Sequence, residues 1–137
     1  MTTLIFACVH NAGRSQMAAA FFNALADPTK ARAESAGTQP GDRVHAEVFD
    51  AMREIGIDLS NARPQRLTTE MASRAQHLIT MGCGDDCPFV PGITRDDWPL
   101  DDPKGQTPDR VRQIRDEIRE RVAALIAREH WAINEPR

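Results

Sequence analysis

The sequence predicts an α/β fold, a three-layer sandwich in which a four-stranded parallel sheet carries helices on both faces. The first observation is that strand-like and helix-like segments alternate along the chain, a pattern typical of parallel sheets. The second is size and composition: 137 residues, of which 41% are hydrophobic and 27% charged, suit a single globular domain over residues 1–137. No internal repeat or linker divides the sequence.

The first part of the chain supplies two strands with a helix between them. Residues 3–8, TLIFAC, form a short apolar run of the kind that becomes a buried strand. Residues 15–25, SQMAAAFFNAL, are rich in strong helix formers, and Asp27-Pro28 ends that helix. A second, shorter strand is expected over residues 31–37, ARAESAG.

The middle of the chain continues the alternation. Residues 42–55 place apolar side chains at helical spacing and are followed by Gly56, which predicts a helix. A short helical turn near residues 68–73 leads into a strand over 76–82. The chain then becomes rich in loops, and we expect a small fourth strand over residues 94–98.

A long helix follows these loops. Thr107 is a typical N-cap residue, and Pro108 suits the first position of a helix. The helix after it carries one apolar face, which we expect to pack on the core: Val111, Ile114, Ile118, Val122 and Leu125.

Charge and apolar runs restrict the kinds of partner. The formal net charge is −3, with Lys and Arg spread along the chain, which argues against a nucleic-acid binder. The longest apolar run is too short to span a bilayer, and no signal-peptide pattern precedes it. We therefore expect a cytoplasmic protein without membrane contact, in which Cys8, Cys83 and Cys87 rest as thiols.

The candidate site lies around the end of the first strand, because working sites of parallel sheets lie at the carboxyl ends of strands. Backbone N–H groups of the loop after Cys8 can converge on an anion, and Arg14 offers a planar fork that matches a tetrahedral oxyanion. This positive field favours the thiolate of Cys8, to which Ser15 can donate a hydrogen bond. The alternative is a buried strand cysteine beside a surface arginine. The oxyanion-binding residues expected here are Val9, His10, Asn11, Ala12, Gly13, Arg14 and Ser15.

The segment CVHNAGRS, residues 8–15, resembles the phosphate-binding loop Cys-x5-Arg-Ser of the low-molecular-weight tyrosine phosphatases and of the arsenate reductases that share their fold. Asn11 also matches that loop, where it holds the backbone in shape. The resemblance continues through ESAGT, GIDLSNARPQ, LITMGCGDDCP and DDWPLDDPKG, nearly the whole chain. It implies that arsenate is the substrate, with phosphate or sulfate as mimics. It also implies that Asp102, rather than Asp101, is the general acid.

Two further cysteines, Cys83 and Cys87, favour the reductase. A phosphatase cycle ends when water cleaves a phosphocysteine, whereas arsenate reduction leaves an oxidised cysteine that needs electrons. Thioredoxin-coupled arsenate reductases, which the chain resembles, carry a relay pair after the third strand. The resemblance implies a Cys8–Cys83 disulfide that passes to Cys83–Cys87, so that Cys8, Cys83 and Cys87 are all catalytic. Thioredoxin is then the electron donor, and no cofactor is bound.

Three other interpretations stay open at this point. Related actinobacterial enzymes use mycothiol and then a glutaredoxin-like protein, a route that makes the relay pair dispensable. A low-molecular-weight protein tyrosine phosphatase is disfavoured because the sequence has no tyrosine and places Lys104-Gly105 after the Asp-Pro pair. A non-enzymatic oxyanion-binding or redox-sensing module would switch disulfides without turnover.

We expect no metal site and a monomer. Cys83 and Cys87 form a lone Cys-x3-Cys pair, which is a weak signal for zinc without a second pair. Some related reductases bind potassium near the loop through acidic side chains. Ala19 and Gln65 stand at the corresponding positions here, which predicts that the potassium site is absent.

Overall fold

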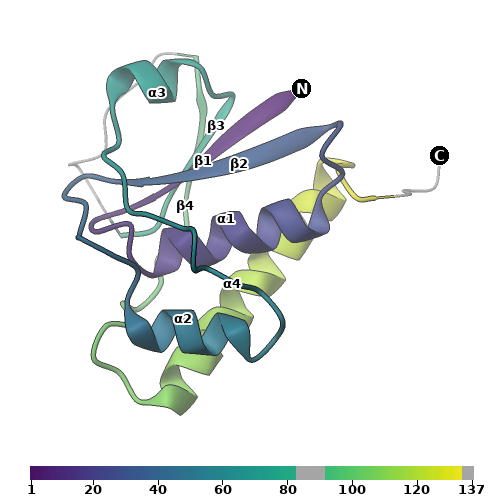
Figure 1. Ribbon diagram of the computed structural model, residues 1–137. Coiled ribbons are helices and arrows are strands. Elements are labelled where there is room, and N and C mark those ends of the chain that lie inside the picture. The colour runs from purple at the N-terminus through teal and green to yellow at the C-terminus, as the bar shows by residue number, and fades with distance from the viewer. Residues whose placement is uncertain (83–91, 134–137) are drawn as a thin grey trace.

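The computed structural model describes residues 1–82 and 92–133, and it has the predicted α/β architecture (Figure 1). Four strands form one sheet in the order β2-β1-β3-β4, and every neighbouring pair is parallel. The strands are β1 (Thr2–Cys8), β2 (Ala31–Gly37), β3 (His77–Thr80) and β4 (Thr94–Asp97).

The register of the sheet brings the carboxyl ends of its strands to one edge. Cys8 at the end of β1 lies opposite Gly37 at the end of β2, and Ala7 lies opposite Thr80 at the end of β3. The loop after β1 therefore begins where β2 and β3 also end. This edge is where a parallel sheet places its working residues.

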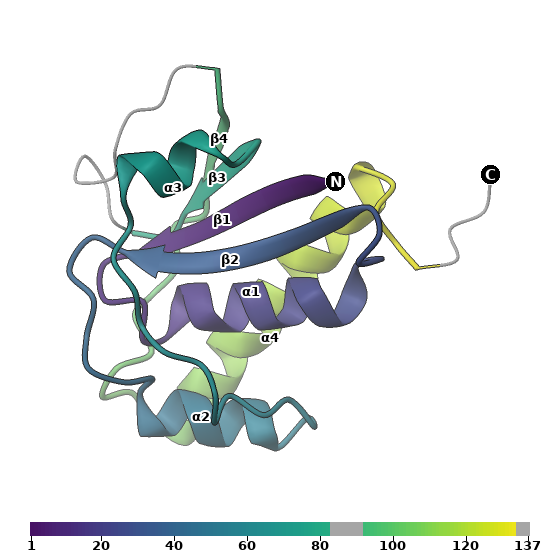
Figure 2. The same cartoon turned by 45° about the horizontal axis from the view of Figure 1, so that its top comes forward.

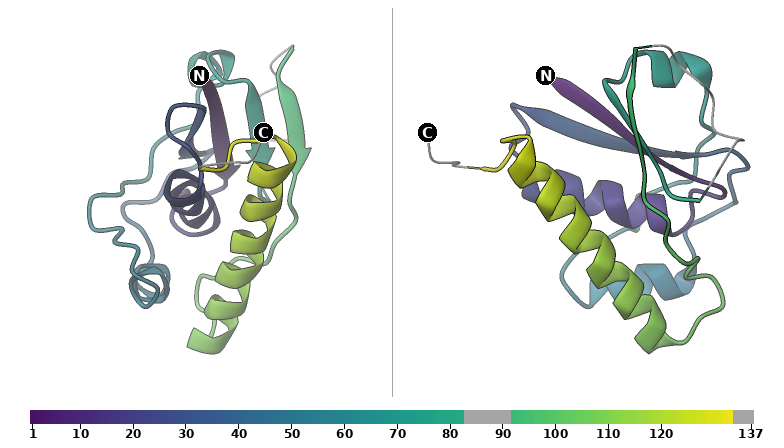
Figure 3. Two further views of the ribbon diagram at one scale, coloured as in Figure 1. Left: turned by 90° about the vertical axis from the view of Figure 1, so that its right-hand side faces the viewer. Right: turned by 180° about the vertical axis from the view of Figure 1, so that it is seen from behind.

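Helices cover both faces of the sheet. Helices α1 and α4 lie together on one face with α2 beyond them, and α3 lies on the opposite face (Figures 2 and 3). Among the described residues, no helix is long and apolar enough to cross a membrane. The helices are α1 (Arg14–Leu25), α2 (Ala46–Arg53), α3 (Thr69–Ser73) and α4 (Pro108–Arg128).

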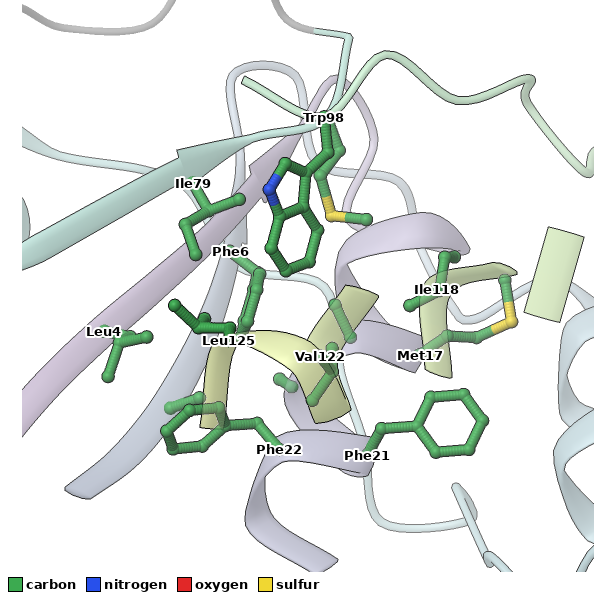
Figure 4. Close-up of a cluster of buried hydrophobic side chains, with 14 of the residues drawn as sticks. Leu4, Phe6, Met17, Phe21, Phe22, Ile79, Trp98, Ile118, Val122 and Leu125 are labelled. Carbon is green, nitrogen blue, oxygen red and sulfur yellow. The ribbon is translucent and has the colours of Figure 1, made fainter. Parts of the chain in front are cut away.

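The core is divided between the two faces of the sheet. The larger cluster fills the space between β1, α1 and α4, where Phe6 packs against Phe22 and Trp98 (Figure 4). The apolar stripe predicted for the last helix is buried in it. A smaller cluster around Ile5 and Leu78 lies under α3. Both faces of β1 are buried, and this explains why its apolar residues form a continuous run.

One predicted helix is shorter than its apolar pattern indicates. The pattern covers residues 42–55, but α2 begins at Ala46 and ends at Arg53. The N–H groups of Gly41 and His45 donate to carbonyl oxygens of the loop after β1, at 2.9 Å each. These residues hold that loop instead of extending the helix.

Candidate functional site

The sulfur of Cys8 lies at the base of the candidate site, where the buried end of β1 meets the start of α1. Cys8 is 2% exposed, and its Sγ lies 2.9 Å from the Oγ of Ser15. Asn11 Nδ2 donates to the same Ser15 oxygen at 2.7 Å. A hydroxyl has two lone pairs and one hydrogen, so Ser15 can accept from Asn11 and still donate to the sulfur. This arrangement leaves the hydroxyl hydrogen of Ser15 available to the sulfur of Cys8.

The carbonyl oxygens of the loop are bonded to the surrounding chain. Four of these carbonyl oxygens accept from backbone N–H groups of the chain after β2, at 2.8–3.2 Å. The pairs are Cys8 with Thr38, Val9 with Gln39, His10 with Gly41 and Ala12 with His45. The carbonyl of Asn11 accepts from Gln16 Nε2 at 3.0 Å, and that of Gly13 from the N–H of Met17 at 3.0 Å. Among the hydrogen bonds of the described residues, none uses a backbone N–H from 10–15 as its donor. The loop thus keeps its donors available for an anion.

Asn11 fixes the path of the loop. It is fully buried, and its φ of 52° lies in the left-handed region that asparagine tolerates better than most residues. Its Oδ1 accepts from the N–H of Gln65 at 2.9 Å and from Gln16 Nε2 at 3.3 Å. Gln16 also donates to the carbonyl of Arg63 at 3.2 Å. The loop is therefore tied to the segment that precedes α3.

Gly37, at the end of β2, makes room for the loop. A Cβ at this position would lie 2.6 Å from the carbonyl oxygen of Val9 and 2.9 Å from the backbone nitrogen of Asn11. Both neighbours are backbone atoms, so neither can move away without shifting the loop. The glycine in the sequence ESAGT is required by this close approach.

Arg14 opens α1, and its guanidinium reaches the loop before α4. The side chain is buried, with Nη1 donating to the carbonyl of Leu100 at 3.0 Å. Its Nη2 lies 3.9 Å from Asp102 Oδ2, while Asp102 Oδ1 accepts from the N–H of Lys104 at 3.0 Å. Asp101 pairs instead with Arg110, at the surface. Of the two neighbouring carboxylates, Asp102 is the one beside Arg14.

The structure thus brings together Cys8, Asn11, Arg14, Ser15 and Asp102, whereas Cys83 and Cys87 lie outside the described residues. Within residues 1–82 and 92–133, no three His, Cys, Asp or Glu side chains form a group that could hold a metal ion. Residues that sequence reasoning did not single out also shape the site: Gln16, Gly37, Gly82 and Leu100. Three of these residues, Gly37, Gly82 and Leu100, stand in segments shared with the resembled family, whereas Gln16 does not.

Gln65, which stands where some related reductases carry an acidic side chain, contacts both the loop and β2. Its Nε2 donates to the carbonyl oxygen of Ser35 at 2.8 Å, and its N–H donates to Asn11. An amide hydrogen therefore satisfies this carbonyl. The lack of a potassium site stays a prediction.

Comparison with known proteins agrees with this geometry. A relative from Halobacterium salinarum, named provisionally as an arsenate reductase, is 40% identical over 128 residues, with 88% of this chain and 87% of the relative covered. The glutaredoxin arsenate reductase of a Synechocystis species is 34% identical, with 93% of this chain and 98% of the relative covered.

A solved structure and a family model agree with these relatives. The thioredoxin-dependent arsenate reductase of Corynebacterium glutamicum has a TM-score of 0.83 and 35% identity. The match covers 95% of this chain but spans 62% of that longer chain. The model of the family described as low molecular weight phosphotyrosine protein phosphatase matches residues 3–135. This chain belongs to the low molecular weight phosphotyrosine protein phosphatase family.

Proposed function

We propose that this protein reduces arsenate to arsenite, with Cys8 as the nucleophile. The observation that carries the proposal is the contact of 2.9 Å between Cys8 Sγ and Ser15 Oγ, beneath a loop whose carbonyls are bonded elsewhere. The relatives named as arsenate reductases support this choice of substrate. A thiolate under a ring of N–H donors is suited to attack a bound tetrahedral oxyanion.

In the first step, the thiolate of Cys8 attacks arsenic, and one oxygen of arsenate leaves as water. Arg14 and the N–H groups of residues 9–15 hold the remaining oxygens and the negative charge. Asp102 donates the proton to the departing oxygen. Its Oδ2 lies 3.9 Å from Arg14 Nη2, which supports this role because the carboxyl group stands beside the residue proposed to bind the anion.

In the second step, the thiolate of Cys83 attacks the sulfur of Cys8. The Cys8–Cys83 disulfide forms, the bond from sulfur to arsenic breaks, and its electron pair reduces arsenic from the +5 to the +3 state. Cys87 then attacks Cys83, which frees Cys8 and leaves a Cys83–Cys87 disulfide. The dithiol of thioredoxin reduces that disulfide, so that each cycle consumes two electrons.

The proposal also names the electron donor, thioredoxin. The presence of both Cys83 and Cys87 favours a relay to thioredoxin, and the relative from Corynebacterium glutamicum is thioredoxin-dependent. The relative from Synechocystis is named for glutaredoxin instead. A route through a small thiol such as mycothiol would not need Cys87.

Hydrolysis of phosphotyrosine is the second candidate, because the family is described by that activity. The same loop would bind phosphate, and Asp102 would protonate a phenolic oxygen. The sequence has no tyrosine, however, and Lys104-Gly105 follows the Asp-Pro pair. These residues offer no aromatic surface for the phenyl ring, so we expect only weak activity on small aryl phosphates.

We further propose that the chain works as one domain over residues 1–137, as a monomer in the cytoplasm. It needs no metal or bound cofactor in this mechanism, because the thiols carry both electrons. A sedimentation measurement that gives a stable dimer would overturn the proposed oligomeric state.

The test follows NADPH consumption by thioredoxin and thioredoxin reductase with arsenate. Wild type is compared with Cys8→Ser, Cys83→Ser and Cys87→Ser, and with Ser73→Ala as a matched surface control. We expect turnover by wild type and the control and none by the three cysteine variants.

Each other outcome points to a different function. Turnover by Cys87→Ser with mycothiol would replace the thioredoxin relay. Hydrolysis of an aryl phosphate by Cys83→Ser, without arsenate turnover by wild type, would favour the phosphatase. Disulfide formation without either activity would leave a redox-sensing module.

A further inference from the structure

Gly82 lies against the guanidinium of Arg14. The N–H of Met81 still donates to the carbonyl of Ala7 at 2.7 Å, one residue beyond the end of β3. The chain then turns at Gly82 with a φ of 104°. A Cβ at Gly82 would lie 2.5 Å from Arg14 Nη1, 3.3 Å from Cζ and 3.6 Å from Nη2. The guanidinium thus occupies the space that a side chain at position 82 would need.

The guanidinium is also held by the loop before α4. Its Nη1 donates to Leu100 at 3.0 Å, and its Nη2 lies 3.9 Å from Asp102. Arg14 therefore sits between Gly82 on one strand end and this loop, and it is only 9% exposed. Its orientation depends on both segments.

We infer that Gly82 is a positioning residue for oxyanion binding, because its missing side chain lets Arg14 hold the guanidinium at the site. This inference rests on the proposed function and names a residue that sets its substrate affinity. The three atoms nearest to the added Cβ all belong to the tip of one long side chain. A methyl group at position 82 would therefore displace the arginine rather than the backbone.

A loss of anion binding through Arg14 can be separated from a general loss of stability by a control variant. Alanine at a φ of 104° is strained in any surroundings. Gly92 offers a matched control: it has a φ of 83°, and among the described residues a Cβ there would have no neighbour within 4 Å. Gly92→Ala therefore reproduces the backbone strain without any contact with Arg14.

The experiment measures binding of inorganic phosphate to the reduced protein by calorimetry, for wild type, Gly82→Ala and Gly92→Ala. We expect Gly82→Ala to raise the Kd for phosphate about tenfold or more, since hydrogen bonds to charged groups are among the stronger ones. Gly92→Ala should stay within about twofold of wild type, because no other part of the described chain lies near its Cβ. Equal Kd values for the two variants would overturn the inference.

Two further measurements distinguish the possible causes of a negative result. If wild type itself binds no phosphate, the proposed function fails at its first step, a result distinct from failure of the role of Gly82. If Gly82→Ala does not fold, the double variant Arg14→Ala with Gly82→Ala should fold, because the guanidinium no longer occupies the space of the methyl group. A double variant that also fails to fold would show that the conflict lies elsewhere, and would overturn the inference.

Discussion

Among the described residues, Ser15 is the one whose hydroxyl group lies within hydrogen-bond distance of the Cys8 sulfur. Removing that hydroxyl in Ser15→Ala should lower arsenate turnover about tenfold or more, because a hydrogen bond to a charged group contributes roughly 1.5–3 kcal/mol. The rate of Cys8 alkylation by iodoacetamide at neutral pH should fall as well, since the thiolate is the reactive form. Ser73→Ala is the control: its Oγ donates to the carbonyl of Glu70 on α3. Equal rates for the two variants would contradict the role of Ser15.

Gly37 and Gly41 give a second matched pair, beside the same loop. A Cβ at Gly37 would lie 2.6 Å from the Val9 oxygen, whereas one at Gly41 would lie 3.8 Å from the His10 oxygen, an ordinary contact. We expect Gly37→Ala to lower the free energy of unfolding by about 1–3 kcal/mol through overpacking. Gly41→Ala should stay within about 0.5 kcal/mol. Urea denaturation of both variants tests this, and a similar loss in each would refute the steric argument.

At the scale of elements, the start of β3 contacts the chain just beyond α4. The ring of His77 lies 5.4 Å from that of Trp131, in an edge-on arrangement. Burial lowers the pKa of His77 below its usual value, against the opposing charge of Glu129. The unfolded chain, with an ordinary histidine pKa near 6.5, therefore binds a proton at a pH where the folded chain does not.

Stability should consequently fall as the pH drops through about 6.5 toward the pKa of folded His77. Above that window neither state binds the proton, and the effect vanishes. His77→Gln should lose less unfolding free energy than wild type between pH 7.5 and pH 5.5, as measured by urea denaturation. Parallel losses in the two proteins would show that other groups cause the acid sensitivity.

The elements also show what the sequence could predict. Strand β1 and helix α4 follow from clear apolar patterns, because each buries a continuous run or a single stripe. Strand β4 has four exposed residues and no apolar pattern, so pairing with β3 makes it a strand. The start of α2 depends on hydrogen bonds to a distant loop, which no local pattern contains.

The same distinction applies to the site. The residues from Cys8 to Ser15 are adjacent in sequence, so their chemistry was visible in their order. Gln16 contacts Arg63 and Gly82 lies against Arg14, each pair far apart in the sequence, and no local pattern gives either residue its role. Such residues become apparent only when the fold brings distant segments together.

At the scale of the whole molecule, anion binding should stabilise the fold. A ligand that binds only the folded state adds about 2.7 kcal/mol at a concentration of one hundred times its Kd. We expect phosphate and sulfate to raise the Tm of reduced wild type, and the gain to vanish in Arg14→Ala. Sodium chloride at equal ionic strength is the control, and an equal gain from it would point to general screening. Potassium and sodium phosphate should act alike if, as predicted from Ala19 and Gln65, the potassium site is absent.

The bonded carbonyls of the loop from Cys8 to Gly13 have a consequence for selectivity. Each carbonyl is held by a neighbouring segment, so changing the curvature of the loop means breaking contacts with α1, with the chain after β2, or with both. A loop held in this way cannot adapt its curvature to the anion that it binds. It should therefore discriminate by geometry as well as by charge, accepting tetrahedral anions of similar radius and rejecting planar ones such as nitrate, whatever their abundance.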